Sequence, residues 1–233
     1  MELTLIRHAQ PQWYVDDIHQ GLDPGLTALG FEQAERLADY LADILTKDSF
    51  DEILVSPLLR ARQTAAPLLA RLGQPEHIAE WLREITDPPV EGQSKQDVLA
   101  LFEAEHLAPL SERWLGLPGG ERIDDFHERI NSGLTDFLAP FGIGRGDHEI
   151  PSWTGTLAKG ASGPRILCIA HGGTNAVITA ALLGANRVPF EWFRFWFGHT
   201  TIARLTAEAT SGIVYFALRA LEAPHLPSAL QTT

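Results

Sequence analysis

The chain has 233 residues, of which 45% are apolar, and it carries a formal net charge of −12 at pH 7. This length and apolar content suit a single α/β domain, and the acidic balance argues against a nucleic-acid partner, because affinity for a phosphate backbone comes mainly from clustered lysine and arginine. The single cysteine, Cys168, excludes an internal disulfide and a thiolate metal cluster. An anionic ligand must therefore be held by a few local cations.

The sequence predicts a cytoplasmic protein with no membrane partner. MELTLIRHAQ at the N-terminus lacks a basic region followed by a long apolar stretch, so no signal peptide is evident. No apolar run reaches the roughly 20 residues that a membrane-spanning helix needs.

The first elements in chain order are a strand and a helix separated by a loop. ELTLIR at 2–7 is rich in leucine and isoleucine and predicts a buried strand, and the prolines and glycines at 11–25 predict a loop. TALGFEQAERLADYLADIL at 27–45 repeats apolar residues at helical spacing, with Thr27 as a reasonable N-cap.

A second strand and helix follow. EILVS at 52–56 predicts a buried strand that runs into a helix in SPLLRARQTAAPLLARLG at 56–73. Ser56 is suited to cap this helix and Pro57 to occupy its first position. Pro67 is expected to kink the helix or to end its first half.

The middle of the chain combines helices with variable loops. A short strand and a turn are predicted around HIAEWLREI at 77–85, and the polar segment 86–119 surrounds a helix at QDVLALFEAEHL. GGERIDDFHERINSGLTDFLAPF at 119–141 predicts an amphipathic helix with one apolar face. Residues 140–164 are rich in Gly, Pro and Ser and are expected to form a second variable loop.

The last third of the chain contains the clearest strand, RILCIA at 165–170, followed by a tightly packed helix in GGTNAVITAALLG. TTIARLT and IVYFALR then predict closing strands, and EAPHLPSALQTT predicts a poorly ordered tail. Strands that alternate with helices favour an α/β fold, a three-layer α/β/α sandwich with a mainly parallel central sheet, in a single domain over residues 1–233.

Two strands end on chemistry-bearing side chains. LIRHA delivers Arg7 and His8, and CIAHG delivers His171. Ligands of parallel α/β sheets lie at the carboxyl ends of the strands, so the two histidines can share one pocket. The helix after EILVS carries Arg60 in its first turn, where the helix N-terminus also favours anions. This arrangement predicts a phosphoryl site; Arg62 is expected to be a surface residue.

These segments resemble the histidine phosphatase superfamily, also called the phosphoglycerate mutase-like family. LIRHA stands where the family has Arg-His-Gly after a strand, and SPLLRARQTA is similar to its Ser-Pro-x-x-Arg-Ala-x-x-Thr-Ala segment. WLREI, GGER with the later Phe126 and Arg129, and AHGG resemble further family patterns in the family order. The resemblance runs from residue 3 to about 206 and implies a histidine phosphatase-like domain.

The resemblance implies a role for each site residue. His8 would be the nucleophile, Glu84 the general acid, and His171, protonated beside phosphate, would stabilise charge on the oxygens. Phosphate would be bound by Arg7, Arg60, His8 and His171. No metal and no cofactor is required. The expected function is hydrolysis of phosphate monoesters through a phosphohistidine intermediate, on a phosphorylated small molecule or a phosphoprotein.

Departures from the family pattern leave alternatives open. Ala9 and Gln10 replace common family residues, and Tyr14 stands where many members have a phosphate-contacting asparagine. Because of these changes, a non-catalytic phosphoryl-binding or scaffolding role is still an alternative. The mutase branch has an adjacent arginine pair for the substrate carboxylate, which the sequence lacks between Glu84 and Glu121, so a phosphatase is favoured over a mutase-type phosphotransferase. A metal hydrolase using both histidines lacks an accompanying acidic motif.

Aromatic residues lie beside the segments that should overhang the pocket. They suggest a partly apolar leaving group, such as an aryl or nucleoside phosphate, and are Trp13, Tyr14, Trp81, Trp114 and Trp153. WFRFWFG at 192–198 is interpreted as core, with a subunit contact in a homodimer left open. His199 is expected to be a structural residue at the start of a strand. Should Glu84 not be the acid, Glu121 is the next candidate.

Overall fold

The computed structural model describes residues 1–14, 16, 21, 23–44, 50–147, 152–157 and 163–233. Its strands are β1 (Glu2–Arg7), β2 (Glu52–Val55), β3 (His77–Ile78), β4 (Ile143–Arg145), β5 (Trp153–Gly155), β6 (Arg165–Ala170), β7 (Ile202–Thr210) and β8 (Ile213–Glu222). Its α-helices are α1 (Ala28–Ile44), α2 (Leu59–Leu72), α3 (Lys95–Leu107), α4 (Leu110–Arg113), α5 (Ile123–Leu138) and α6 (Gly172–Leu182). Short 3₁₀ helices are η1 (Gln12–Tyr14), η2 (Glu80–Leu82), η3 (Ala139–Phe141), η4 (Glu191–Phe193) and η5 (Ser228–Leu230).

The described strands form one eight-stranded sheet in the order β3-β2-β6-β1-β7-β8-β5-β4. The half that contains β3, β2, β6 and β1 is parallel, as the sequence predicts. The other half is antiparallel, because β7 runs against β1 and then returns through the hairpin to β8. The α/β class is confirmed, with a sheet that is mixed overall.

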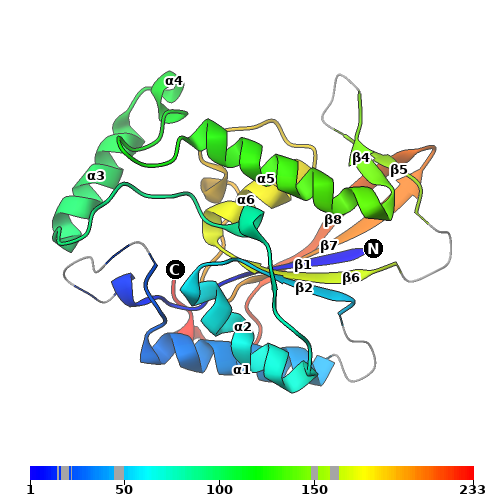
Figure 1. The fold of residues 1–233 in the computed structure, drawn as a ribbon, viewed down its shortest axis with the longest axis horizontal. Helices are drawn as coiled ribbons and strands as arrows, with labels where there is room; N and C mark the ends of the chain where they lie inside the picture. The colour runs from blue at the N-terminus through cyan, green and yellow to red at the C-terminus, as the bar shows by residue number, and fades with distance from the viewer. Residues whose placement is uncertain (15, 17–20, 22, 45–49, 148–151, 158–162) are drawn as a thin grey trace.

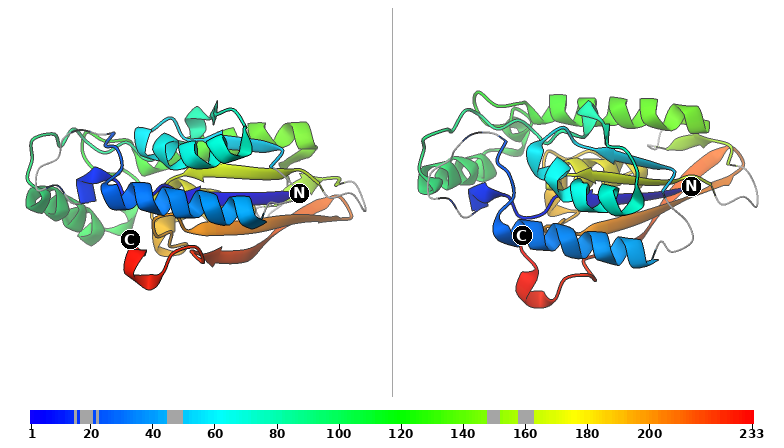
Figure 2. Two further views of the ribbon diagram at one scale, coloured as in Figure 1. Left: turned by 90° about the horizontal axis from the view of Figure 1, so that it is seen from below. Right: turned by 60° about the horizontal axis from the view of Figure 1, so that its bottom comes forward.

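Helices cover both faces of the sheet, which gives three layers. α1 and α2 lie on one face, and α5 and α6 lie on the other (Figures 1 and 2). An apolar core lies between the sheet and the helices on each face. One packs Leu37, Leu41 and Leu68 against Ile6 and neighbouring sheet residues. The other packs the predicted apolar face of α5 against the opposite side of the sheet, with Phe126, Ile130 and Leu134 fully buried. Alternating strand side chains account for the two-sided burial of β1 and β6.

The second helix departs from its prediction at both prolines. α2 begins at Leu59, and its N-cap is Leu58 with no side-chain cap, so Ser56 and Pro57 precede the helix. Pro67 lies inside a helix that continues to Leu72. The buried face of α2 packs against α1 and the sheet, and this packing offsets the backbone hydrogen bond that proline removes.

The predicted loop at 140–164 contains two short strands. β4 and β5 pair with each other, and β5 extends the sheet beyond β8. Trp153 is buried in the core, so tertiary packing rather than local propensity makes this segment a sheet edge. Residues 148–151 and 158–162 of the predicted loop lie outside the described residues.

The chain end packs onto the fold, contrary to the predicted loose tail. The side chain of Leu226 is buried, and the Gln33 Nε2 of α1 donates to the carbonyl of Leu230 at 2.7 Å. The backbone N–H of His199 donates to the carbonyl of Thr232 at 2.9 Å. These partners come from distant parts of the chain, so no local sequence pattern in the tail predicts that it packs. Within the described residues, no helix is both long and apolar enough to cross a membrane.

Candidate active site

The two strand-end histidines meet at one edge of the sheet. β1 and β6 are parallel neighbours in which Arg7 is level with Ala170, so the next residues, His8 and His171, emerge side by side. Their ring centroids lie 5.0 Å apart with the planes at 60°. Both side chains are buried. The topology therefore places two imidazoles at the carboxyl ends of parallel strands, where α/β sheets bind ligands.

The surroundings of His8 define which nitrogen holds the lone pair. Nδ1 lies 2.7 Å from the carbonyl oxygen of Ala9, which can only accept, so Nδ1 carries the proton. Nε2 then accepts from Arg60 Nε at 3.3 Å. Burial lowers the pKa of His8 well below its usual value, and the charge of Arg60 lowers it further. The ligand-free His8 is a neutral imidazole whose Nε2 lone pair faces a guanidinium.

The residues after His8 hold the strand end in place. The N–H of Ala9 donates to Thr64 Oγ1 at 2.9 Å, and the N–H of Gln10 donates to Gln33 Oε1 at 2.9 Å. A Cβ at Gly30 would lie 2.2 Å from the Gln10 carbonyl oxygen, so glycine is required there despite its low helix propensity. Gln10 thus has a structural role, whereas the side chain of Tyr14 lies outside what the structure describes.

His171 precedes α6 as its N-cap residue. Its Nε2 lies 2.6 Å from Ser56 Oγ, so Ser56 binds the second histidine and does not cap α2. Burial lowers the pKa of His171 well below its usual value, and Arg60 and Arg7 lower it further. The ligand-free His171 is therefore neutral, and the protonated form expected from the sequence requires the negative charge of a bound phosphate.

Two arginines surround the histidines. The Arg60 side chain is buried, and its Nη1 lies 3.6 Å from an oxygen of Asp23. Burial lowers the pKa of Arg60, and the charges of Glu84 and Asp23 oppose this effect. Arg7 Nη1 donates to the carbonyl of Phe197 at 2.6 Å, which fixes its direction toward the cleft. Arg62 instead pairs with a surface glutamate, as the sequence predicts.

Glu84 lies against the N-terminus of α6. Its carboxylate accepts from the N–H groups of Gly173 at 2.9 Å and Thr174 at 3.0 Å, and also from Thr174 Oγ1 at 3.1 Å. Arg129 supports the same segment, because its guanidinium donates to the carbonyls of Trp81 and Arg83 and, at the longer distance of 3.4 Å, of Glu84. The Glu84 carboxyl is thus held at the start of the helix that follows His171, and it lines the pocket that also contains His8.

Glu121 is engaged elsewhere. Its carboxylate accepts from Arg129 at 2.9 and 3.0 Å and from the N–H of Thr86 at 3.0 Å. This partly buried ion pair ties the start of α5 to the segment that carries Glu84. Glu121 is therefore less suited than Glu84 to exchange a proton.

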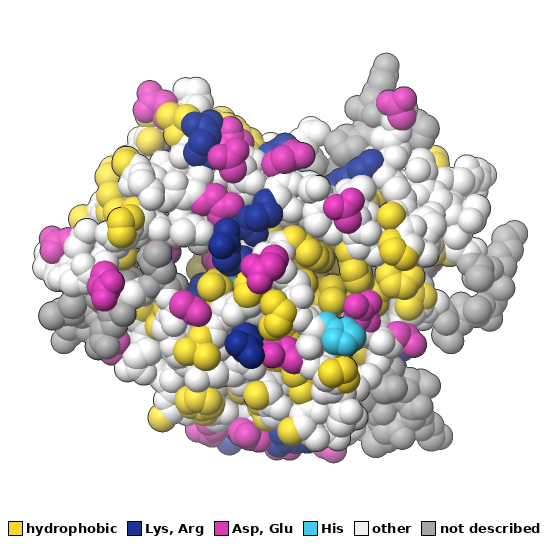
Figure 3. All heavy atoms as spheres, in the orientation of Figure 1, with side chains coloured by type: hydrophobic (Ala, Val, Ile, Leu, Met, Phe, Trp, Pro, Cys, Tyr) yellow, Lys and Arg dark blue, Asp and Glu magenta, His cyan; other side chains and the backbone are white. Residues whose placement is uncertain are grey.

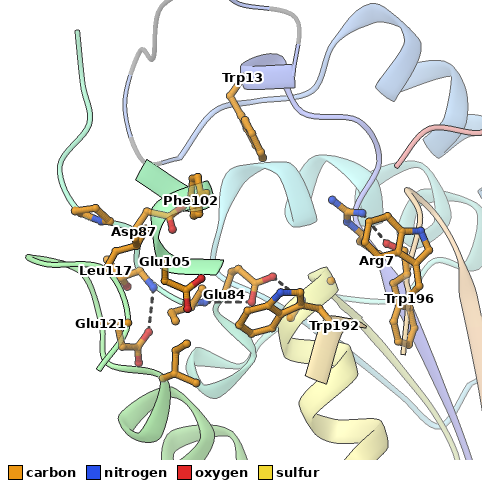
Figure 4. Close-up of a pocket in the computed structure, with 18 residues that line it drawn as sticks. Arg7, Trp13, Glu84, Asp87, Phe102, Glu105, Leu117, Glu121, Trp192 and Trp196 are labelled. Carbon is orange, nitrogen blue, oxygen red and sulfur yellow. Dashed lines mark hydrogen bonds between the residues drawn. The ribbon is translucent and has the colours of Figure 1, made fainter. Parts of the chain in front are cut away.

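A cleft of about 290 Å³ opens next to this cluster. It lies between the N-terminus of α6, the 84–88 segment, α3 and the 192–197 segment, and the molecular surface is hollowed between α3 and the main body (Figure 3). Figure 4 shows Arg7 on one side of the cleft and Asp87 and Phe102 on the other, with Trp13 and Trp192 facing across it.

The aromatic lining differs from the prediction. Trp13 lines the cleft, but Trp81 packs near Phe137, Trp114 packs on His127, and Trp153 is buried in the core. The cleft instead receives rings from the 192–198 segment, which the sequence assigned to the core, and these are Trp192, Trp196 and Phe197. This segment lies between α6 and β7 and folds back over the strand ends, so its apolar pattern reflects a binding wall as well as packing.

The histidine phosphatase superfamily (branch 1) model matches residues 3–215. The chain belongs to this superfamily. Glucosyl-3-phosphoglycerate phosphatase of Mycolicibacterium vanbaalenii is 33% identical over 184 residues, covering 78% of this chain and 74% of that protein. The 2,3-bisphosphoglycerate-dependent phosphoglycerate mutase of Methylobacterium sp. is 29% identical over 213 residues, covering 89% and 93%.

A solved structure of a mycobacterial glucosyl-3-phosphoglycerate phosphatase with VO3 has a TM-score of 0.68 at 26% identity, and the match covers 94% of this chain and 97% of that one. These similarities confirm the family predicted from the sequence.

Two residues beside this cluster were not assigned to the candidate site from the sequence. The ring of His199 lies 5.7 Å from that of His8, and the neighbouring Thr200, with a left-handed φ of 55°, donates its N–H to the carbonyl of Arg7 at 3.1 Å. His199 is expected from the sequence to be structural, and its Nδ1 lies 2.8 Å from Thr232 Oγ1 of the chain end. Asp87 lies in the cleft near Glu84, and its only sequence signal is a position three residues after Glu84.

Proposed function

We propose that this chain hydrolyses phosphate monoesters in two steps, through a phosphohistidine on His8 and without a metal ion. The observation that carries the proposal is the neutral His8, whose Nε2 lone pair faces Arg60 while its Nδ1–H is fixed on the Ala9 carbonyl. A neutral imidazole is a nucleophile near pH 7, whereas an imidazolium is not.

In the first step, Arg7 and Arg60 hold the phosphate oxygens and His8 Nε2 attacks phosphorus. The bond from phosphorus to the leaving oxygen breaks as the nitrogen–phosphorus bond forms. A protonated Glu84 gives its proton to the departing oxygen, so the product leaves as an alcohol. His171 lies beside His8 and stabilises charge on the phosphoryl oxygens.

In the second step, water attacks phosphorus and gives a proton to the Glu84 carboxylate. The electron pair of the nitrogen–phosphorus bond returns to His8, and inorganic phosphate leaves. Donors from Gly173 and Thr174 keep the Glu84 carboxylate in one position through both steps. Arg7, Arg60 and, once phosphate is bound, a protonated His171 supply the positive charge that a metal ion would otherwise provide.

A mutase-type phosphotransferase is the second candidate, because some relatives carry that name. Phosphoglycerate contains a carboxylate besides its phosphate. Among the described residues that line the cleft, Arg7 is the one cation, and it lies at the phosphate end. The cleft therefore favours a phosphatase over a phosphoglycerate mutase, because its described lining offers no second cation to bind a substrate carboxylate.

Turnover of p-nitrophenyl phosphate in excess chelator tests the proposal, together with rapid-quench labelling from a phosphorus-labelled substrate. We expect full turnover, an acid-labile and base-stable label, and a loss of about 10³-fold or more in His8→Ala, as for other covalent nucleophiles. His77→Ala, which removes an exposed histidine on β3, is the matched control. A label that persists in His8→Ala contradicts the nucleophile, and activity that needs an added divalent ion contradicts the metal-free mechanism.

A further inference from the structure

The cleft beyond the phosphate end is both aromatic and acidic. Its lining combines rings from Trp13, Phe102, Trp192, Trp196 and Phe197 with the carboxylates of Glu84, Asp87, Glu105 and Glu121. In Figure 4 Phe102, Asp87, Glu105 and Glu121 lie on the far side of the cleft from Arg7, Trp13 and Trp192 lie between, and Trp196 lies beside Arg7. A leaving group attached to a phosphate held at Arg7 must extend into this space.

The four carboxylates are not equivalent. Glu121 is paired with Arg129, and Glu84 is held by the N-terminus of α6. Asp87 has no hydrogen bond or ion pair to any described residue and adjoins both the cleft and the pocket around His8 and Arg60. Although the Asp87 side chain is solvent-exposed, desolvation in the cleft and the charge of Glu84 raise the pKa of its carboxyl to about 6, so the carboxylate is mostly ionised at pH 7. Glu105 of α3 also lines the cleft, but it has an interaction partner of its own, so Asp87 is the carboxylate best placed to meet a ligand.

Two segments that line the cleft share this charge. Of the described residues within 11–25, Asp16 and Asp23 are acidic and none is lysine or arginine. Residues 86–107 contain five acidic residues and a single lysine, Lys95. A negative field over the leaving-group end is therefore a property of the sequence of these segments as well as of the side chains that line the cleft.

Anionic, neutral aromatic and cationic leaving groups would bind in this part of the cleft with different affinity. An anionic leaving group would meet like charges from Asp87 and Glu105, and the described lining offers it no cation beyond the phosphate end. A neutral aromatic group would gain contact with the rings only. An organic cation would gain contact with the rings, attraction to their faces and attraction to the carboxylates.

We propose that the physiological substrates are phosphate monoesters of an apolar organic cation, such as a quaternary ammonium alcohol, whose cationic group lies between the tryptophans and beside Asp87. This inference rests on the proposed phosphatase function. It narrows that function to one chemical class and replaces the neutral aryl or nucleoside phosphate suggested by sequence alone.

An isosteric pair of substrates isolates the charge. Choline phosphate and 3,3-dimethylbutyl phosphate have nearly the same shape and differ in one positive charge, so their ratio of kcat/KM cancels the chemistry at phosphorus. We expect the ratio to favour choline phosphate by about tenfold, within the range of cation–π and partly screened charge attraction. Inhibition constants of both compounds against p-nitrophenyl phosphate give the same ratio for binding. The anionic substrate 3-phosphoglycerate should be the poorest of the three.

Asp87→Asn tests the residue, because it removes the charge and keeps the shape. The preference for choline phosphate should fall toward one in Asp87→Asn. Glu91→Gln is the matched control, since Glu91 is an exposed acid on the same segment that does not line the cleft. The rate of phosphohistidine hydrolysis, measured after the alcohol has left, should be the same whichever substrate loaded the enzyme.

The inference is overturned if 3,3-dimethylbutyl phosphate has the same kcat/KM and the same inhibition constant as choline phosphate. It is also overturned if Glu91→Gln changes the ratio of kcat/KM as much as Asp87→Asn does. Failure of the phosphatase function itself has a different signature. It would remove p-nitrophenyl phosphate turnover and the His8 label, both of which persist when only the substrate class is wrong.

Discussion

The proposed phosphate end and the proposed leaving-group end of the cleft are built from different kinds of structure. At the phosphate end, Arg7, His8 and His171 stand at the ends of neighbouring strands, and Arg60 stands in the first turn of a helix. At the leaving-group end, the side chains come from η1, the 84–88 segment, α3 and the 192–197 segment. Backbone hydrogen bonds of the sheet and of α2 fix the first set, whereas packing between separate segments positions the second.

This difference separates chemistry from selectivity. The phosphate end handles a group that is common to every substrate, so rigid strand ends suit it. The leaving-group end meets the part that varies between substrates, and loops can change there without disturbing the sheet. Substitutions at the phosphate end should therefore affect all substrates alike, and those at the leaving-group end should change the order of preference.

Glu84→Gln is expected to have the largest effect, because Glu84 lies where the two ends meet. Loss of general acid catalysis should slow alkyl phosphates by about 10²- to 10⁴-fold. p-Nitrophenolate leaves without a proton, so the first step on p-nitrophenyl phosphate should suffer less, and phosphohistidine should accumulate while its hydrolysis lags. Pre-steady-state kinetics on both substrates measure this difference. Glu80→Gln, at an exposed position of η2, is the control, and equal near-wild-type rates in Glu84→Gln would move the acid role to another carboxyl.

Ser56→Ala should have a smaller effect that is confined to the phosphate end. The variant removes the 2.6 Å hydrogen bond to His171 Nε2 and leaves a buried imidazole nitrogen without its partner. We expect kcat to fall by about tenfold, equivalent to roughly 1.4 kcal/mol, and by the same factor for cationic and neutral substrates. Steady-state kinetics with the isosteric pair measure both factors. A fall in kcat for one substrate only would contradict the proposed separation of chemistry from selectivity. Ser111→Ala, at an exposed position, is the control.

His127 lies outside both ends and should influence stability alone. It is buried beside Trp114, and neither ring nitrogen has a hydrogen-bond partner among the described residues. Burial lowers the pKa of His127 to about 4, with a contribution from Arg187. The unfolded chain, with a histidine pKa near 6.5, therefore binds more protons between pH 6.5 and 4, and the free energy of unfolding falls as the pH drops through this window.

Urea unfolding at pH 7, 5.5 and 4.5 measures this loss, which is expected to be on the order of 1–3 kcal/mol from His127 alone at the acid end. His127→Leu should reduce the pH dependence by this amount because leucine cannot bind a proton, while the other buried histidines keep their contribution. His77→Leu replaces an exposed histidine and should leave the slope unchanged. An unchanged slope in His127→Leu would show that other groups cause the acid sensitivity.

The sequence by itself determined the family, the alternation of strands and helices and the candidates for the phosphate end. Arg7, His8 and His171 can be paired from the sequence alone, because apolar strands are visible in the pattern and the ends of parallel strands meet at one edge. Glu84 and Arg60 follow from their motif segments. Each of these inferences needs only local sequence and one rule of topology.

Only the tertiary structure decided what surrounds these residues. Serine is a residue type that often caps helices, but the packed fold places Ser56 against His171. Trp192 and Trp196 have the pattern of core residues, yet they line the cleft because their segment folds back over the strand ends. Arg60, which is distant in sequence, lies close enough to Asp87 to oppose the rise in its pKa that desolvation and Glu84 cause. Contacts of this kind join residues far apart in the chain, and since no local periodicity encodes them, they become visible only once the layers are assembled.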